Sequence, residues 1–189
     1  MRAPLRLLPF LLIATLLGAC ATLQQVLALR QVAFALESVG AGRLAGVPLA
    51  RIGAYRDLTA LEVTQLALAL GRGTAPLDFT VGLRASNPES NGTAKLVKLD
   101  WLLLLDGRET IRGVIDSSYT LPAGQPVTIP IRIQLDLKQF FDGGIEEMVG
   151  LASGLVGARS DPTRITLELQ PQIDTPLGPL STPAPIRVS

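Results

Sequence analysis

Histidine is absent from this 189-residue chain, and cysteine occurs only once, as Cys20. The missing imidazole excludes catalytic systems that need a histidine base, such as the Ser-His-Asp triad and the Cys-His pair. One thiol without any histidine also excludes zinc and copper sites built from nitrogen and sulfur ligands. A carboxylate-only or Ser-Lys enzyme stays open, but the acidic residues are scattered and no phosphate, dinucleotide or calcium-binding motif occurs. We therefore expect no catalytic residues, no metal, no cofactor and no enzyme activity.

Charge is sparse as well, with 17 basic and 16 acidic residues in near balance. No basic run or patch occurs, so nucleic acid is not an expected partner. Because 48% of the residues are hydrophobic and only 17% are charged, the chain has the composition of a protein that buries a core. Residues 20–189 have the size of a single domain.

The N-terminal segment has the three parts of a secretory leader: a start with two arginines, an apolar stretch over 7–17, and small residues before a cleavage point. The apolar stretch is shorter than the about 20 residues that a transmembrane helix needs. Leu17-Gly18-Ala19-Cys20 resembles the bacterial lipobox, in which the cysteine sulfur receives diacylglycerol and the chain is cleaved just before it. We therefore expect a lipoprotein signal peptide over 1–19, lipid attachment at Cys20 and a lipidated tether over 20–30.

The alternative to lipidation is an ordinary signal peptide followed by an incidental cysteine, or an uncleaved anchor. A lone cysteine in an exported protein calls for an explanation, however, and lipidation supplies one. Two or three acyl chains, palmitate among them, would hold the protein firmly on a membrane. Residue 21 is alanine and not aspartate, which by resemblance to lipoproteins of double-membrane bacteria favours the outer membrane, facing the periplasm. In a single-membrane bacterium the same signal would mean the outer face of the plasma membrane.

Alternation of apolar and polar residues dominates the rest of the chain and predicts β-strands. The clearest such stretch is 127–137, where Pro130 cannot donate a ladder hydrogen bond, so we expect this strand at a sheet edge. A stretch with apolar residues from Val97 to Leu105 leads into Asp106-Gly107, a strong hairpin signal. Further alternating faces lie at 32–36, 77–83, 111–119, 165–169 and 186–188. About seven short strands predict an all-β chain folded as an antiparallel sandwich.

Two helical patterns interrupt the strands. The first, Thr59–Leu70, begins with a capping box completed by Glu62, and we expect it to stop at Gly71. Because few of its residues are polar, it should be covered on most of its circumference. The second, Ile145–Leu155, has an apolar side and a polar side on which we expect Ser153. The two helices are predicted as short insertions in the sandwich.

A series of turn and strand motifs resembles the water-stress and hypersensitive-response (WHy) domain of the late-embryogenesis-abundant (LEA) group 2, or LEA type 2, proteins. The series consists of Asn87-Pro88 after an alternating strand, Asp106-Gly107 after a long strand, Gly113 in the return strand, Pro122-Ala123-Gly124, and a late Asp174-to-Leu180 segment. The resemblance covers roughly residues 31–189. It implies a fibronectin-III-like or immunoglobulin-like β-sandwich with helical elaboration, and no enzymatic activity.

The residues that carry this resemblance have structural explanations, and we expect no ligand role for them. Asn87 and Pro88 suit a turn, and Gly113 permits a bulge or a close approach of other groups to the backbone. A helical insertion around 54–71 looks longer than the connection usual in the family. It is expected to be a local addition, a lid or a partner surface.

The resemblance implies a protective or accessory protein of the cell envelope, active in desiccation or osmotic stress. One alternative is a carrier of lipid or another hydrophobic ligand, suggested by the apolar helix over 59–70 and the doubly apolar strand end at 102–105. The same apolar faces could instead simply pack together. A further alternative is an assembly subunit that binds through the edge strand near Pro130 or the proline-rich tail. The expected partners are the membrane, through the lipid, and envelope proteins or lipids.

Overall fold

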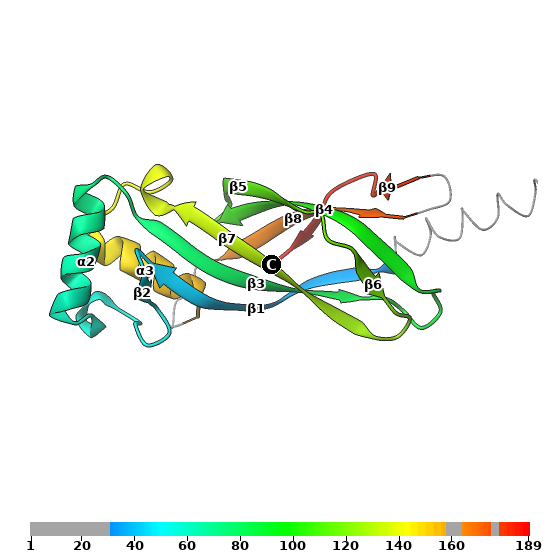
Figure 1. Cartoon of the computed structure of the whole chain (residues 1–189), viewed down its shortest axis with the longest axis horizontal. Coiled ribbons are helices and arrows are strands. Elements are labelled where there is room, and N and C mark those ends of the chain that lie inside the picture. The colour runs from blue at the N-terminus through cyan, green and yellow to red at the C-terminus, as the bar shows by residue number, and fades with distance from the viewer. Residues whose placement is uncertain (1–30, 158–163, 175–177) are drawn as a thin grey trace, which may run out of the picture.

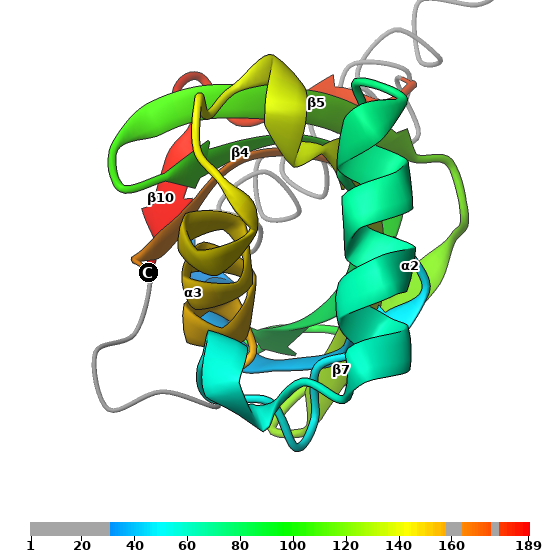
Figure 2. The same cartoon turned by 90° about the vertical axis from the view of Figure 1, so that its left-hand side faces the viewer.

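Residues 31–157, 164–174 and 178–189 are described by the structure, a computed structural model. The predicted signal peptide, Cys20 and the tether lie outside the described residues. Two antiparallel sheets stack on one another, and two helices lie at one end of the stack (Figures 1 and 2). The prediction of an all-β sandwich with two short helical insertions is confirmed. No helix in the described part of the chain is long and apolar enough to cross a membrane.

The first sheet has four strands in the order β2–β1–β3–β7. Their bounds are β1 Ala33–Leu44, β2 Val47–Pro48, β3 Pro76–Ser86 and β7 Pro126–Asp136. The central strand β3 buries every second residue from Leu77 to Ala85, as the alternation predicts. The edge position expected for β7 is also confirmed, and Pro130 there lies opposite Gly82 of β3.

The second sheet has the order β10–β8–β4–β5, with β6 paired to β4 and β9 paired to β8. The bounds are β4 Ala94–Leu105, β5 Arg108–Ile115, β6 Tyr119–Leu121, β8 Ile165–Ile173, β9 Leu180–Ser181 and β10 Ile186–Val188. Asp106 and Gly107 join β4 to β5 with φ angles of 48° and 81°. Both angles are positive, as the predicted two-residue hairpin turn requires.

The core lies between the two sheets. The inward-facing residues predicted for β4 were wrong at the beginning of that strand. In β4 the buried residue is Leu96 and not the expected Val97, which is half-buried. The pairing of β4 with β8 shifts register between Leu96 and Lys98. Such a bulge moves the inward face by one residue, and the predicted alternation holds from Leu99 to Leu105.

The helical elements are η1 Tyr55–Asp57, α2 Ala60–Gly71, η2 Leu137–Gln139 and α3 Ile145–Leu155. Both α-helices have nearly the predicted bounds. α2 ends at Gly71, as expected, but Gly71 is its last helical residue and the left-handed conformation is taken by Gly73, with φ 77°. The exposed position expected for Ser153 was wrong, because Ser153 is fully buried, whereas Glu146 and Glu147 on the predicted polar side are exposed.

Candidate functional site

The most unusual surface of the domain is the outward side of α2. Leu61 is 77% exposed and Leu68 is 57% exposed, whereas Leu66, on the opposite side, is only 3% exposed. Leu61 and Leu68 are seven residues apart, so they lie on one face of the helix. The expected cover on most of the circumference was therefore wrong. α2 packs through a single side against the end of the sandwich, and its other side faces solvent (Figure 2).

The polar side chains of α2 bond back to the protein. The Thr64 hydroxyl donates to the backbone oxygen of Ala60 at 2.9 Å. The Gln65 amide donates to the backbone oxygen of Ala45, in the β1–β2 turn, at 2.7 Å. Besides the exposed Thr64 and Gln65, the outward face carries Leu61 and Leu68 together with small residues: Ala60, Ala67 and Gly71.

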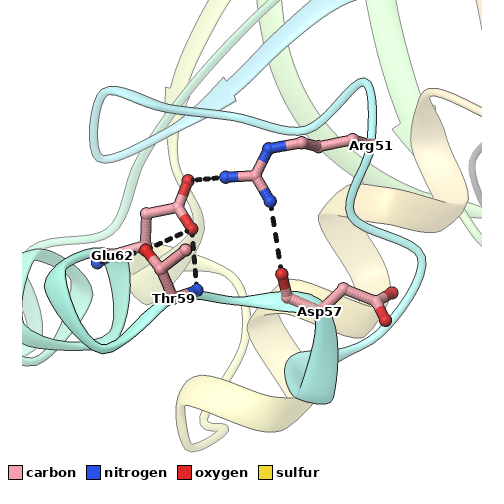
Figure 3. A network of polar contacts seen from close by, with 4 residues as sticks. All are labelled: Arg51, Asp57, Thr59 and Glu62. Atoms are coloured by element: carbon pink, nitrogen blue, oxygen red, sulfur yellow. Dashed lines mark hydrogen bonds and ion pairs between the residues drawn. The ribbon is translucent and has the colours of Figure 1, made fainter.

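The start of α2 is fixed by a polar network (Figure 3). The Thr59 backbone N–H and hydroxyl donate to Glu62 Oε2 at 2.9 and 2.8 Å, and the Glu62 N–H donates to Thr59 Oγ1 at 3.4 Å. This is the capping box predicted from the sequence. Arg51 extends it by an ion pair with Glu62 Oε1 and by donating from Nη1 to the backbone oxygen of Asp57 at 3.3 Å. Segments 51–57 and 59–62 are therefore joined by side chains.

The electrostatics of this network favour the ionised form of Glu62. The Thr59 backbone N–H, the Arg51 guanidinium and the Thr59 hydroxyl lower the pKa of Glu62 from 4.5 to about 2. The carboxylate therefore stays charged, and the network stays closed, at all but strongly acidic pH. Asp57 is bonded as well: its Oδ2 accepts from the N–H groups of Gly53 and Ala54 at 3.0 and 2.9 Å.

Two arginines flank the exposed leucines. Arg56 lies in η1, just before α2, and Arg72 is the C-cap residue of α2. Both side chains are exposed, and neither forms an ion pair with another described residue. Tyr55, 38% exposed, adds a third large apolar group beside Arg56. This end of the domain, which we call the α2 cap (residues 51–73), thus combines an apolar centre with cationic flanks.

The sequence identified only part of the α2 cap. The helix and its Thr59–Glu62 box were predicted, and the insertion was proposed as a possible partner surface. Arg51, Arg56 and Arg72 were missed. Arg72 follows directly on the helical pattern and could have been noticed, but Arg51 reaches Glu62 through the fold and has no local signal.

Beneath the cap there is almost no space for a ligand. The gap between α2, α3 and the β1–β2 turn has a volume of about 10 Å³ and is lined by Leu66, Leu70 and Met148 among others. That volume is at the lower limit for a single water molecule. The apolar inner side of α2 is thus used for packing, and the described residues form no carrier cavity at this place.

A larger hollow lies on the outer face of the second sheet, over the stretch where Gly113 pairs with Trp101. The Trp101 ring itself lies on the opposite, core-facing side. A Cβ at Gly113 would overlap the Trp101 ring, which confirms the expected close approach. The hollow has a volume of about 440 Å³ and is lined by Leu102 and Val114 together with charged neighbours such as Arg112. It is open and shallow, and Val114 is 50% exposed.

Asn87 has the structural role expected of it, although by different bonds. Its side chain is buried and donates to the backbone oxygens of Gly92 and Leu121, at 3.1 and 2.8 Å, while accepting from Asn91 at 2.9 Å. The amide therefore joins two loops rather than bonding only its own turn. Among the described residues, no group of three acidic, cysteine or histidine side chains lies close enough to hold a metal ion.

Comparisons with known proteins give only structural likenesses. No model of a known protein family matches the sequence, and no curated protein matches it either. Among solved structures, the chain is similar to a protein from Archaeoglobus fulgidus, with 12% identity and a TM-score of 0.38 over 81% of this chain and 94% of that one. It is also similar to a putative late embryogenesis abundant (LEA) protein, with 14% identity and a TM-score of 0.38 over 93% and 83%. These likenesses concern the fold alone.

Proposed function

We propose that this protein is a lipid-anchored, non-enzymatic protein of the cell envelope, with a LEA group 2-like sandwich that protects or assists other components under desiccation or osmotic stress. The observation that carries the proposal is the α2 cap, which turns Leu61 and Leu68 to solvent on a helix fixed by a polar network. Large apolar side chains kept exposed on a well-ordered element are typical of a contact surface. The lipobox-like sequence ending in Cys20 supports attachment to the outer membrane, facing the periplasm.

The two parts of this proposal support each other physically. A lipid at Cys20 would confine the domain to the membrane surface, where even a weak contact surface is effective because its target is locally concentrated. The apolar cap could then cover apolar surface that drying or osmotic shock exposes on neighbouring components. No chemical step is required of the domain.

A gene deletion with complementation tests this function. We expect the deletion strain to lose survival after drying and osmotic shock, and the wild-type gene to restore it. Cys20→Ala should abolish labelling by palmitate and fail to restore survival, and the double variant Leu61→Gln/Leu68→Gln should also fail. Leu180→Gln changes an exposed apolar residue of β9, away from both the cap and the hollow, and serves as the matched control. Unchanged survival of the deletion strain would rule out the protective role.

A hydrophobic-ligand carrier is the second candidate, and the hollow above Trp101 and Gly113 is the observation that favours it. Val114 lines the hollow and is 50% exposed, so a polar residue there tests the site directly. A carrier should retain lipid in native mass spectrometry of the non-acylated protein, and Val114→Gln should reduce that retention. Absence of both effects would leave the hollow as ordinary surface.

A further inference from the structure

α2 lies across one end of the sandwich, transverse to the long direction of the strands (Figures 1 and 2). The whole outward side of the helix can therefore lie flat on a surface that the domain meets end-on. This is the orientation of interfacial helices, which lie in the plane of a membrane with their apolar side in the boundary between headgroups and acyl chains.

The composition of the outward side fits such a surface. Its centre is apolar, and the nearby hydroxyl and amide of Thr64 and Gln65 already have partners within the protein. The bonded donors would lose little on leaving water, because a buried polar group is costly chiefly when it lacks a hydrogen bond. The Gln65 side-chain oxygen would bond to water or to a headgroup in the boundary region.

The charged residues of the cap indicate which kind of surface it can bind. Glu62 is paired with Arg51, and the Asp57 carboxylate accepts two backbone hydrogen bonds. Among the described residues, Arg56 and Arg72 are the cationic side chains of the cap without an ion pair, one at each end of α2. With three arginines against Asp57 and Glu62, the cap has a net charge of +1. Lysine and arginine at the surface of an anionic membrane contribute about fivefold each to binding. We propose that the α2 cap docks on a lipid surface that carries anionic headgroups.

The position of the cap relative to the anchor indicates which membrane this is, and this step depends on the proposed lipidation of Cys20. β1 begins at Ala33, opposite Ser86 at the far end of β3, and runs toward α2. Its 12 residues span about 40 Å. The tether over 20–30 reaches about 40 Å only when fully extended. A tether stretched to its limit would be needed for end-on docking to the anchoring membrane, so the cap is suited to a membrane that faces the anchored one.

The expected strength is modest. Leu61 and Leu68 should contribute roughly tenfold each to the partition coefficient, judging by the area that they can still bury. Together with the two arginines, this resembles the marginal and reversible membrane binding of a single acyl chain. Docking of this strength becomes effective when the lipid anchor keeps many copies in place between two surfaces.

Vesicle flotation tests the docking itself. The chain from Ala21 to Ser189 is suitable because the described core lies entirely within residues 32–188. We expect it to float with vesicles of phosphatidylcholine and phosphatidylglycerol, and much less with phosphatidylcholine alone or at high salt. Leu61→Gln/Leu68→Gln should lower the partition coefficient by roughly a hundredfold, and Arg56→Gln/Arg72→Gln by roughly 25-fold. Leu180→Gln, at an exposed position of β9, should change nothing.

Either of two results overturns the docking. One is equal flotation of the wild type and the double leucine variant. The other is a dimer in sedimentation experiments that the double leucine variant dissociates, since the face would then be covered by a second copy. Neither result bears on stress survival, which is measured in cells, so this proposal and the protective function can fail separately.

The facing-membrane orientation is tested through the single cysteine. The chain from Cys20 to Ser189 can be coupled through its only thiol to a maleimide lipid in neutral vesicles, which reproduces the anchor. Adding anionic vesicles should cause clustering, seen as a rise in light scattering, and the double leucine variant should prevent it. Flotation of the free domain without clustering of the coupled domain would overturn this orientation.

Discussion

The two α-helices bounded within the described residues, α2 and α3, are alike in length and apolar content and differ in their surroundings. α2 and α3 have 12 and 11 residues and are both rich in apolar side chains. α3 buries seven consecutive or nearly consecutive residues from Met148 to Leu155, whereas α2 buries only Leu66. Apolar content therefore does not determine how much of a helix is covered.

The size of the side chains explains much of this difference. α3 carries Gly150, Ser153 and Gly154 on the sides that its larger residues leave free, which lets neighbouring elements approach closely. At its end, Val156 lies so close to Gly42 of β1 that a Cβ there would overlap it. α2 instead has Leu61 and Leu68 on its outward face, and no described element packs over these two side chains.

The largest loss of stability should come from truncating a buried side chain of α3. Leu155→Ala removes a side chain that is 3% exposed, and we expect a loss of about 2–4 kcal/mol in the free energy of unfolding. Urea denaturation measures this loss. The same change at Leu68 of α2, which is 57% exposed, should cost less than about 1 kcal/mol. Similar losses at the two positions would contradict the comparison.

A smaller effect of opposite sign is expected at Ser153. Its hydroxyl is buried and has no hydrogen-bond partner among the described residues. Ser153→Ala removes this unsatisfied group and inserts a better helix former, so the free energy of unfolding should rise by about 1 kcal/mol. Ser153→Thr keeps the hydroxyl and adds a methyl group in a packed place, so it should destabilise. A loss of stability in Ser153→Ala would show that the hydroxyl has a role in α3.

The comparison also depends on the network that fixes α2. The folded-state pKa of Glu62, about 2, lies below its ordinary value of 4.5. The stabilising contribution is therefore fully present above about pH 4.5 and is lost as the pH falls toward 2. An NMR titration of the Glu62 carboxyl should show this low pKa in the wild type.

Arg51→Ala provides the matched variant. It should raise the pKa of Glu62 toward its ordinary value, although not fully, because the Thr59 N–H and hydroxyl remain. Loss of order in α2 should then begin at a higher pH than in the wild type, while α3 is unaffected. A Glu62 pKa that does not move in this variant would mean that Arg51 does not hold the cap.

The sequence predicted well whatever depends on local pattern. The alternation of β7 and β3, the Asp106-Gly107 turn and the Thr59–Glu62 capping box all follow from neighbouring residues, and each occurs in the structure. The bulge near Val97 was not predicted, because a register shift depends on the partner strand β8.

The sequence alone could not predict which side chains of each helix are buried by other elements. The outward position of Leu61 and the buried position of Ser153 are set by elements distant in the chain. The same holds for Arg51, whose bond to Glu62 spans a loop and η1. The apolar character of α2 was visible from the start. Whether its apolar side chains are buried in the core or exposed to a partner depends on tertiary structure.

The smallest expected effect concerns the leucines that face solvent. Leu61→Gln/Leu68→Gln replaces exposed side chains by a residue of similar helix propensity, so the free energy of unfolding should stay within about 0.5 kcal/mol of the wild type. Leu66→Gln makes the same change at the buried position of the same helix. Burying that amide without a partner should cost more than about 2 kcal/mol. A comparable loss of unfolding free energy in the double variant, measured by thermal or urea denaturation, would mean that Leu61 and Leu68 are part of the folded core. A double variant that is as stable as the wild type but no longer docks would separate the role of these leucines in binding from any role in stability.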